Sequence, residues 1–598
     1  MARTWLDTPV QWHSSRVVSS DHVDGLTDAE VAFIQSKWHN WYTADWDYGQ
    51  TTLAFFCAGI AWLLILGVIF RLRSRLSTTR SSDTNVPGCL DRLTAVCRYT
   101  VASQYRVRLF RWYSPPLAAI VGVAGMFMFT MILMLAARPY YWPKPAMGHS
   151  MPIATRSGWI SIAIMPFMIA FSTKVNWIGL LTGTSHEKLQ VFHRWSATIM
   201  YITSLVHTFP FIVVSIRHGE MELNWETGTF YWTGVAALVP QTWLIFMSWG
   251  FFRNKYYETF KKLHFAAAIL FMFFLFIHCD WTLTSWDYFW ATLAIYSTAF
   301  LARTTRTLYN SSLGLSASVS TLPGGMLKLD VQTPSRVRWR PGQHVFVRFV
   351  SLGIHAFSSH PFTIASIPNV ESSGDSELEL AFAVRGGITK RLAGLVRDKP
   401  SKALRVWVDG PYGGIPGKSM GEYDHVYLLA GGSGVTFTLS LLMDLSRRAK
   451  IKELELKCKH VEFILAVKSH DSILWLEDQL TAARASGFTV RVHVTQADTP
   501  SVGGLKEGDD SSNVVCGRPN LPSIIRKACQ TNTGTMAVAA CGPDSFLYDV
   551  RNAVADCQLA IADGYGQCKD LFLHTENYRL VVHCQIISVV SLMLFDSW

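Results

Sequence analysis

Four histidines stand in two apolar stretches of this chain, and their spacing is the same in both. "HRWSATIMYITSLVH" begins with His193 and ends with His207, and "HFAAAILFMFFLFIH" begins with His264 and ends with His278. Fourteen residues of α-helix rise roughly 21 Å and turn about 40° short of four full turns. Both histidines of each stretch are therefore expected on nearly one helix face, close to opposite surfaces of a membrane.

Imidazole pairs at two depths are the ligand set that two bis-histidine haems require, because each iron takes one nitrogen from each helix. A basic segment precedes each stretch, so we expect both to run in the same direction. His193 then pairs with His264 on the inner side, and His207 with His278 on the outer side. The alternative is that each histidine is a packed polar residue that hydrogen-bonds across helices. The repeated spacing favours the haem ligands.

Two neighbours of the inner histidine offer further chemistry. Arg194 can grip a haem propionate with two hydrogen bonds, or it can be one more positive residue at the inner membrane surface, and both interpretations stay open. His186 lies seven residues before His193, but Tyr257 stands at the equivalent place in the second stretch. We therefore expect His186 to be an interfacial or structural residue.

Two glycine-containing turns further along the chain have the composition of phosphate sites. "RGGITKRL" (385–392) offers backbone N–H groups, a threonine hydroxyl and an arginine, which are the groups that a pyrophosphate needs. "LLAGGSGVTFTLSLL" (428–442) leads an apolar strand through a glycine turn directly into a helix, although its spacing differs from the Rossmann fingerprint. Each motif alone is a weak indication, because glycine-rich turns are common.

Two cations follow the ends of later apolar segments. Lys468 in "AVKSHDS" and Arg518 in "CGRPNL" are suited to a 2′-phosphate, which favours NADPH over NADH. Cys541 ends the last apolar strand, "AVAACGPDSF", and by itself it is better interpreted as a small buried residue at a strand end.

The elements that position these residues divide the chain of 598 residues into an apolar part and a mixed part. A membrane span needs roughly 20 apolar residues. Seven stretches are candidates: 51–70, 117–136, 158–172, 191–214, 234–252, 263–280 and 286–302. Residues 1–50 are polar and rich in tryptophan, so no cleavable signal peptide is expected, and 51–70 is predicted to be the first anchor.

The formal net charge of +11 is concentrated on one side of this predicted bundle. Arginines crowd the segment 71–111 between the first two spans, which is a positive-inside signal and not a nucleic-acid footprint. The N-terminus is therefore predicted outside and everything after 302 in the cytosol. The 11 cysteines form no CxxC pair, and a disulfide framework is not expected.

After about residue 313 the pattern changes to that of a soluble part. "PGQHVFVRFV" and "ELELAFAVRGG" alternate like antiparallel strands, and from 424 apolar strands alternate with helices, which implies a parallel sheet. The fold class is thus multi-domain: an all-α transmembrane bundle, then a β-barrel, then an α/β domain.

The motifs PGQH, HPFTIAS, RGGIT, DGPYGG, AGGSGVT and CGP follow in this order between residues 341 and 543. This order resembles the ferredoxin-NADP reductase type of flavoprotein. Together with the paired histidines, the chain from about 50 to 575 resembles the fungal ferric/cupric reductases, which belong to a family that also includes the NADPH oxidases. The resemblance implies five parts: an extracytoplasmic segment 1–50, a transmembrane domain 51–305 with about seven helices and two haem sites, an FAD-binding barrel 313–416, an NADPH-binding domain 422–578 and an atypical tail 579–598.

The resemblance also implies roles for matching residues. The flavin would be held by His360, Pro361, Phe362, Thr363 and Ser366, and its phosphates by Arg385, Gly387 and Thr389. NADPH would be held by Gly431, Gly432, Gly434 and Thr436, with Cys541 and Gly542 near the nicotinamide. Lys468 stands where many relatives have arginine, so the charge is kept but a bidentate grip is not. Tyr578 would be the aromatic residue that covers the flavin.

The activity implied is transfer of electrons from cytosolic NADPH through FAD and two haems b to extracytoplasmic ferric or cupric chelates, siderophore-type chelates included, for metal uptake. No catalytic acid or nucleophile is required. The implied setting is the plasma membrane, with a permease or multicopper oxidase downstream and no nucleic acid. A superoxide-producing NADPH oxidase is the alternative, although "GGSGVTFTL" resembles the metalloreductase version of the nucleotide turn. A non-catalytic membrane scaffold or channel is a third interpretation, and it predicts missing cofactor residues.

Overall fold

The computed structural model describes residues 27–30, 43–76, 88–109, 112–141, 150–282, 284–368, 376–398, 403–451, 456–496, 514–565 and 567–577. These residues form two compact units, one from residues up to 69 and from 119 to 302, the other from 70 to 118 and from 303 onward. Tyr578, the tail 579–598, the loop 503–513 and most of the segment 1–50 lie outside the described residues.

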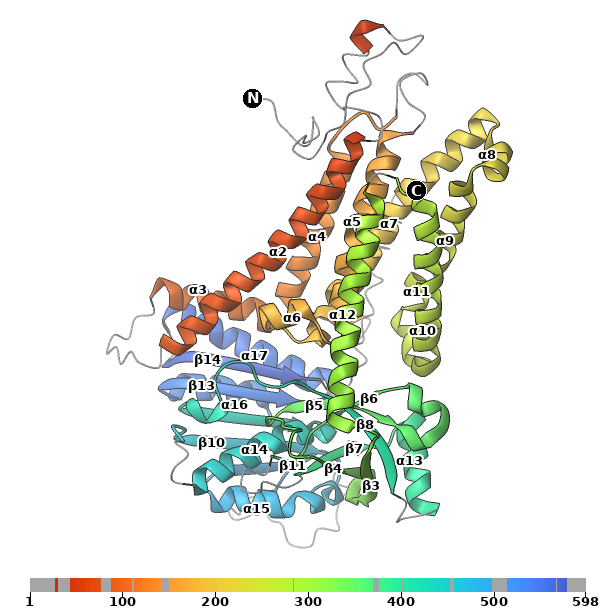
Figure 1. Cartoon of the computed structure of the whole chain (residues 1–598). Helices are drawn as coiled ribbons and strands as arrows, with labels where there is room; N and C mark the ends of the chain where they lie inside the picture. The colour runs from red at the N-terminus through yellow and green to blue at the C-terminus, as the bar shows by residue number, and fades with distance from the viewer. Residues whose placement is uncertain are drawn as a thin grey trace. The chain divides into compact units, whose positions relative to one another are not determined.

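The first unit is built from helices where the structure describes it. They are α2 (Thr43–Leu76), α4 (Leu117–Leu135), α5 (Pro152–Ser172), α6 (Trp177–Thr182), α7 (His186–His218), α8 (Met221–Thr227), α9 (Thr229–Met247), α10 (Gly250–Lys255), α11 (Tyr257–Cys279) and the first part of α12 (Ser285–Ser311). Figure 1 shows the long helices of this unit running side by side, with α5 against α7 and α9 against α11.

Six helices in the described residues are long and apolar enough to cross a membrane. They are Asp47–Ile69, Leu117–Leu135, Pro152–Ser172, His186–His218, Thr229–Met247 and Tyr257–Cys279. The seventh expected stretch, 286–302, is helical within α12 but is not among these six. The helix expected at 158–172 begins earlier, at Pro152, because proline at the first helical position has no N–H to leave unpaired. The helix expected at 191–214 extends to His218, where Gly219 ends it with a φ of +70°.

The first sheet of the second unit is antiparallel, with strand order β6-β5-β8-β3-β4-β7. Its strands are β3 (Leu315–Leu322), β4 (Met326–Thr333), β5 (Gln343–Phe349), β6 (His360–Thr363), β7 (Ser376–Ala383) and β8 (Leu404–Gly413). A bridge between Ile364 and Leu380 joins the two edge strands, so the sheet closes on itself. Alternate side chains fill the interior with Val, Leu and Phe, and helix α13 (Gly387–Asp398) packs beside β3.

The second sheet is parallel throughout, with order β12-β11-β10-β9-β13-β14. Its strands are β9 (His425–Gly431), β10 (His460–Val467), β11 (Thr489–Val494), β12 (Val514–Cys516), β13 (Gly534–Cys541) and β14 (Cys568–Glu576). The helices that connect them are α14 (Val435–Lys450), α15 (Glu477–Ala485), α16 (Leu521–Thr531) and α17 (Asp544–Asp563). The order reverses at β9, which makes the carboxyl end of β9 the expected ligand crevice.

One further helix of this unit comes from far earlier in the chain. Helix α3 (Cys89–Ala102) packs along α17, and the short hairpin β1 (Arg106–Val107) and β2 (Trp112–Tyr113) follows it. Ala95 and Ala102 are buried in the same apolar cluster as Val550 and Val554 of α17. The segment between the first two expected spans therefore belongs to the α/β part of the second unit.

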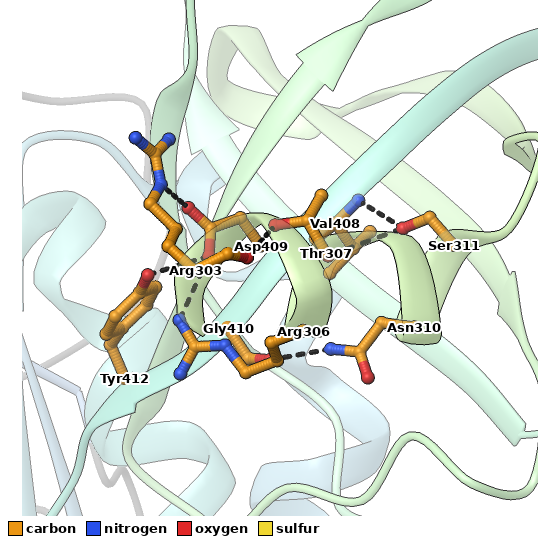
Figure 2. Close-up of polar contacts among 9 residues, drawn as sticks. All are labelled: Arg303, Arg306, Thr307, Asn310, Ser311, Val408, Asp409, Gly410 and Tyr412. Carbon is orange, nitrogen blue, oxygen red and sulfur yellow. Dashed lines mark hydrogen bonds and ion pairs between the residues drawn. The ribbon is translucent and has the colours of Figure 1, made fainter. Parts of the chain in front are cut away.

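Ion pairs connect the last turns of α12 to strand β8 (Figure 2). Asp409 is almost fully buried and accepts hydrogen bonds from Arg303 Nε at 2.6 Å, Arg306 at 3.0 Å and the Tyr412 hydroxyl at 2.7 Å. Burial first, and then the Asp409 carboxylate, raise the pKa of the Tyr412 phenol, so this hydroxyl remains a donor.

Main-chain contacts complete the attachment. Asn310 donates to the Gly410 carbonyl at 2.8 Å, and the Ser311 hydroxyl accepts from the Val408 N–H at 2.8 Å (Figure 2). The end of α12 and the strand β8 thus form one connected element of the second unit.

Candidate functional site

The outer histidines His207 of α7 and His278 of α11 face each other. Their ring centroids lie 5.9 Å apart and their planes are nearly perpendicular, at 83°. His207 Nδ1 lies 2.8 Å from the carbonyl oxygen of Ala154, and His278 Nδ1 lies 2.8 Å from that of Phe230. Because a carbonyl only accepts, each Nδ1 carries the hydrogen and each Nε2 keeps its lone pair. This is the ring state that metal-ligating histidines adopt.

A glycine makes room for each outer ring. A Cβ on Gly158 of α5 would lie 2.6 Å from His207 Nδ1, and a Cβ on Gly234 of α9 would lie 3.0 Å from His278 Cε1. Each glycine stands one helical turn after the carbonyl that its histidine uses, since Ala154 precedes Gly158 by four residues and Phe230 precedes Gly234 by four. The two outer imidazoles therefore pack in the same way, each against a carbonyl and a glycine of a neighbouring helix.

The two inner histidines differ in the hydrogen bonding of Nδ1. His193 Nδ1 lies 2.9 Å from the Met168 carbonyl oxygen on α5, but His264 Nδ1 is buried without a hydrogen-bond partner in the part of the chain that the structure describes. The structure thus brings together the predicted outer pair, His207 with His278, and it places His193 and His264 fourteen residues away from them on the same two helices.

The outer pair fits a haem iron that takes one nitrogen from each of two helices. Among the described residues no group of three or more His, Cys, Asp or Glu side chains is arranged to hold a metal ion. Two metal–nitrogen bonds of about 2.0–2.1 Å would separate the bonded nitrogens by roughly 4 Å, which agrees with rings whose centres are 5.9 Å apart. A porphyrin supplies the remaining ligands of such an iron.

Arg194 offers a charged contact beside the inner pair. Two of its guanidinium nitrogens, Nε and one terminal nitrogen, are buried and have no hydrogen-bond partner among the described residues. An unsatisfied buried guanidinium is costly, and a carboxylate ligand would satisfy it. A haem propionate therefore fits this side chain.

The residues expected to hold the flavin lie on β6 and just after it. Phe362 is buried in the barrel core with its ring 4.4 Å from that of Phe382, so it can meet a ligand only through its main chain. Pro361 and Thr363 alternate with it and lie on the opposite, partly exposed face of the strand. His360 is also partly exposed, and its Nε2 lies 3.0 Å from the Ser358 hydroxyl.

Ser366 has a structural position in the barrel. Its hydroxyl accepts from the Glu379 N–H at 3.1 Å, and its carbonyl accepts from the indole of Trp339 at 3.1 Å. A hydroxyl used in this way stabilises the wall of the barrel and leaves little capacity for a ligand.

The predicted flavin-phosphate residues form the start of α13. Gly387 has a φ of +57°, a conformation that glycine adopts without strain, and the helix begins there. The Thr389 hydroxyl accepts from the Arg385 N–H at 2.9 Å and donates to the Gly386 carbonyl at 3.0 Å. The hydroxyl thus shapes the turn, while the exposed helix N-terminus presents the N–H groups that bind anions.

The three glycines of the nucleotide turn have different surroundings. Added Cβ atoms would lie 2.9 Å from Pro543 at Gly431 and 2.4 Å from the Cys541 carbonyl oxygen at Gly434, so these two allow the end of β9 to pack against the end of β13. Gly432 has a φ of +57° and open space around it, which suits the approach of a phosphate. Thr436 is buried at the start of α14, where its hydroxyl donates to the Ser433 carbonyl at 3.2 Å.

Cys541 and Gly542 lie at the carboxyl end of β13, beside the turn after β9. Cys541 is buried against Gly434, and a Cβ on Gly542 would lie 2.7 Å from the Phe546 ring. Gly434 and Cys541 are far apart in the sequence, but the parallel sheet brings them together at the switch point.

Lys468 and Arg518 lie near the carboxyl ends of β10 and β12, on the same edge of the sheet as this turn. Both side chains are exposed. This position allows either cation to reach the ribose end of a dinucleotide that lies across the strand ends.

The sequence pattern alone did not reveal Gly158, Gly234 or the carbonyl acceptors on α5 and α9. A glycine inside an expected membrane span is common in helix packing, so it carries little information. The acceptors are main-chain atoms and have no residue type. The acceptors can be found only once α5 is known to pack against α7. Ala154 and Met168 are then fourteen residues apart on α5, as His193 and His207 are on α7.

Three family descriptions match consecutive parts of the chain. The ferric reductase like transmembrane component matches residues 157–275, the FAD-binding domain matches 312–415 and the ferric reductase NAD binding domain matches 423–555. The order is that of the helical unit, the barrel and the parallel sheet. FAD and NAD(P) are thus the cofactors that the last two domains indicate.

Fungal proteins are similar over the same region. "Probable cell surface ferric reductase kap2" of Aspergillus oryzae is 33% identical over 415 residues, which cover 65% of this chain and 53% of that protein. "Ferric/cupric reductase transmembrane component 7" of Saccharomyces cerevisiae is 27% identical over 404 residues, covering 65% and 62%. "Ferric reductase transmembrane component 4" of the same yeast is 27% identical over 453 residues, covering 67% and 60%. The chain thus spans between 53% and 62% of the length of these relatives.

Among solved structures, the ferredoxin-NADP+ reductase of Plasmodium falciparum is 14% identical and matches 44% of this chain and 96% of its own, with a TM-score of 0.30. The fold assignment rests on the closed antiparallel sheet followed by the parallel sheet. With six apolar helices before these two sheets, the chain is an integral membrane protein that combines a ferric reductase like transmembrane component, an FAD-binding domain and a ferric reductase NAD binding domain in this order.

Proposed function

We propose that this protein moves electrons from cytosolic NADPH across a membrane to ferric or cupric chelates. The observation that supports this most directly is the double pair of imidazoles, with three of the four rings anchored through Nδ1 and with Nε2 left for iron. FAD would accept a hydride and release electrons singly, and haem iron would carry one electron at a time. One NADPH then reduces two ferric ions and releases one proton.

The residues of the chain have positioning roles in this scheme. His193 and His264 would hold the inner haem, and His207 and His278 the outer haem. Gly432 and the start of α14 would receive the NADPH phosphates, with Lys468 and Arg518 at the 2′-phosphate. Pro361, Thr363 and the turn at Gly387 would bind FAD. An iron with two imidazoles has no free position, so the acceptor would be reduced without binding to it.

The packing of α3 supports an orientation. Because α3 lies between the first two expected spans and packs on α17, the segment after the first span is on the same side of the membrane as the NADPH-binding domain. Five of the six apolar helices follow α3 before the barrel begins. An even number of crossings is needed to return to the same side, so α12 would have to cross as well. This supports seven spans, an N-terminus outside and cytosolic reductase domains, and the plasma membrane is the setting that we propose.

Substrate comparison tests the proposal. The purified full chain should contain two haems and one FAD per polypeptide and should reduce a ferric chelate in the presence of NADPH. His207→Ala should retain one haem and lose chelate reduction, while NADPH-dependent reduction of a soluble dye by the flavin should continue. Rapid superoxide formation with negligible iron reduction would instead identify an NADPH oxidase, and a haem-free protein would support the scaffold interpretation.

A further inference from the structure

One face of the barrel sheet gathers three arginines around a single carboxylate. Arg303 and Arg306 of α12 both donate to Asp409 of β8, at 2.6 Å and 3.0 Å. Asp409 lies opposite Phe346 of β5 in the strand register, so Arg348, two residues further along β5, is its diagonal neighbour on the same face. Asp409 is the one acidic residue in the sequences of β5 and β8. Three guanidinium groups against one carboxylate leave a surplus of positive charge.

Three donors at this face are buried and have no hydrogen-bond partner among the described residues. They are Arg306 Nε, Arg348 Nε and Trp407 Nε1. Trp407 stands directly opposite Arg348 in the register and two residues before Asp409 on β8, so its indole projects to the same side of the sheet. A buried donor without an acceptor is unfavourable. Since all three atoms are donors and the surplus charge is positive, the group that would satisfy them is an anion.

The electrostatics of Arg348 agree with this conclusion. Burial first, and then the neighbouring Arg303 charge, lower the pKa of the Arg348 guanidinium. A bound anion would reduce both effects, because it replaces lost water contacts and offsets the repulsion. Arg303 can also contribute, since its two terminal nitrogens point away from the carboxylate that its Nε contacts (Figure 2).

We infer that Arg306, Arg348 and Trp407 form a binding site for a phosphate group, separate from the phosphate-binding turns proposed at Gly387 and Gly432. A phosphate presents acceptor oxygens in several directions, so it can accept hydrogen bonds from α12, β5 and β8 together. Guanidinium groups bind phosphate with strong, charge-assisted hydrogen bonds.

The position of α12 indicates two sources of this phosphate. Arg303 directly follows the expected span 286–302, and α12 continues to Ser311. The proposed crossing of α12 would therefore bring the site to the inner membrane surface, where the headgroup of an anionic phospholipid can reach it. Inorganic phosphate offers the same chemistry from solution. Only the lipid source rests on the proposed function.

Stabilisation of the purified full chain by ligand tests the inference. The temperature at which FAD is released, followed by flavin fluorescence, should rise with inorganic phosphate at constant ionic strength or with phosphatidic acid in the detergent micelles. Phosphatidylcholine, whose headgroup has no net charge, is the reference lipid. A response to inorganic phosphate indicates a site that is open to solution, and a response to phosphatidic acid alone indicates a lipid site. If neither ligand raises the temperature, the inference is wrong.

Two variants test the donors. Trp407→Phe keeps an aromatic ring and the net charge but removes the Nε1 donor, and Arg348→Gln removes one charge. Each should weaken phosphate binding about ten-fold or more, because one hydrogen bond to a charged ligand is lost. Without ligand, Arg348→Gln should release FAD at the same or a higher temperature, because it removes surplus charge. A lower temperature would indicate a purely structural role for Arg348 and contradict the inference.

Arg526→Gln is the matched control. It makes the same change in net charge at an exposed ion pair with Asp556 of α17, so phosphate should bind as it does to the unmodified chain. Equal weakening in Arg526→Gln and Arg348→Gln would mean that the chain attracts anions only through its overall charge, and the proposed site would be wrong.

Cofactor content separates this inference from its rivals. FAD per chain should be unchanged in Arg348→Gln and Trp407→Phe, and loss of FAD would assign these donors to the flavin and overturn the inference. A chain without haem that still binds phosphate overturns only the proposed function. A chain with two haems that reduces ferric chelate but binds no phosphate at this face overturns only the present inference.

Discussion

Each anchored imidazole uses its two ring nitrogens for different purposes. Nδ1 donates to a helix carbonyl, and Nε2 is left with its lone pair. The hydrogen bond also sets the rotation of the ring, which a metal bond alone would not do. Close approach of the ring to the helix that supplies the carbonyl is possible only where a small residue follows one turn later, as at Gly158.

If His207 and His278 hold a haem as proposed, Gly158→Ala should prevent it from binding. The added Cβ would lie 2.6 Å from His207 Nδ1, so the ring must move away from the Ala154 carbonyl. We expect one haem per chain instead of two, measured as pyridine haemochrome per polypeptide, with FAD content unchanged.

Gly125→Ala provides the control for this substitution. Gly125 also lies in an apolar helix, α4, and an added Cβ meets nothing within 4 Å. Two haems should remain in that variant. Retention of two haems in Gly158→Ala as well would contradict the proposed packing of the His207 ring against Gly158.

At the scale of elements, one buried carboxylate collects the charged contacts between the end of α12 and β8. Asp409 receives donors from two arginines and one tyrosine, and the guanidinium of Arg306 also lies 4.2 Å from the centre of the Tyr412 ring. A buried carboxylate is tolerated only when such donors surround it. The strand that carries Asp409 also pairs with β3 and β5, so this contact connects α12 to the middle of the barrel sheet.

Asp409→Asn should destabilise the barrel. The amide can still accept from Tyr412, but two arginines lose their counter-charge, which should cost about 1–3 kcal/mol given that both are partly exposed. Thermal release of FAD, followed by flavin fluorescence, should occur at a lower temperature than in the unmodified chain.

Asp330→Asn is the comparison variant, because Asp330 forms an ion pair with Lys328 on β4 of the same sheet at a more exposed site. Its effect should stay below about 0.5–1 kcal/mol. If the temperature of FAD release falls equally in the two variants, burial of the Asp409 carboxylate does not increase its contribution to stability.

At the scale of the whole molecule, the second unit is assembled from two distant parts of the chain. Helix α3 and the hairpin after it, at 88–113, join strands and helices from the far end of the sequence. Arg98 of α3 forms an ion pair with Asp570 of β14 and donates to the Leu571 carbonyl at 3.0 Å. The segment between the first two spans is thus a structural part of the NAD-binding domain.

Arg98→Ala should loosen the edge of the parallel sheet. Loss of one half-buried ion pair and one main-chain hydrogen bond should cost about 1 kcal/mol, which corresponds to roughly five-fold faster hydrogen exchange of the β14 amides. Mass spectrometry of the intact chain in detergent can follow this exchange.

Arg526→Ala is the control for this prediction. Arg526 pairs with Asp556 of α17, but both side chains are about half exposed, so exchange in β14 should hardly change. An unchanged exchange rate in Arg98→Ala would argue against a structural role for α3.

The sequence by itself determined the features that depend on short-range spacing. The spacing of His193 and His207 brings both to one helix face whatever surrounds them, and alternation or strand–turn–helix order predicts the barrel and the parallel sheet in their correct succession. The glycine turn after β9 is recognisable for the same reason, because a phosphate needs backbone N–H groups at the start of a helix.

Only the tertiary structure decided what each of these groups touches. Gly432 faces open space while Gly434 packs against Cys541, although the sequence presents them as equivalent. The carbonyls of Ala154, Met168 and Phe230 serve the histidines, but a main-chain acceptor has no residue type to read. Which carbonyl a histidine reaches is a contact between separate helices, and such a contact is set by packing and not by local spacing.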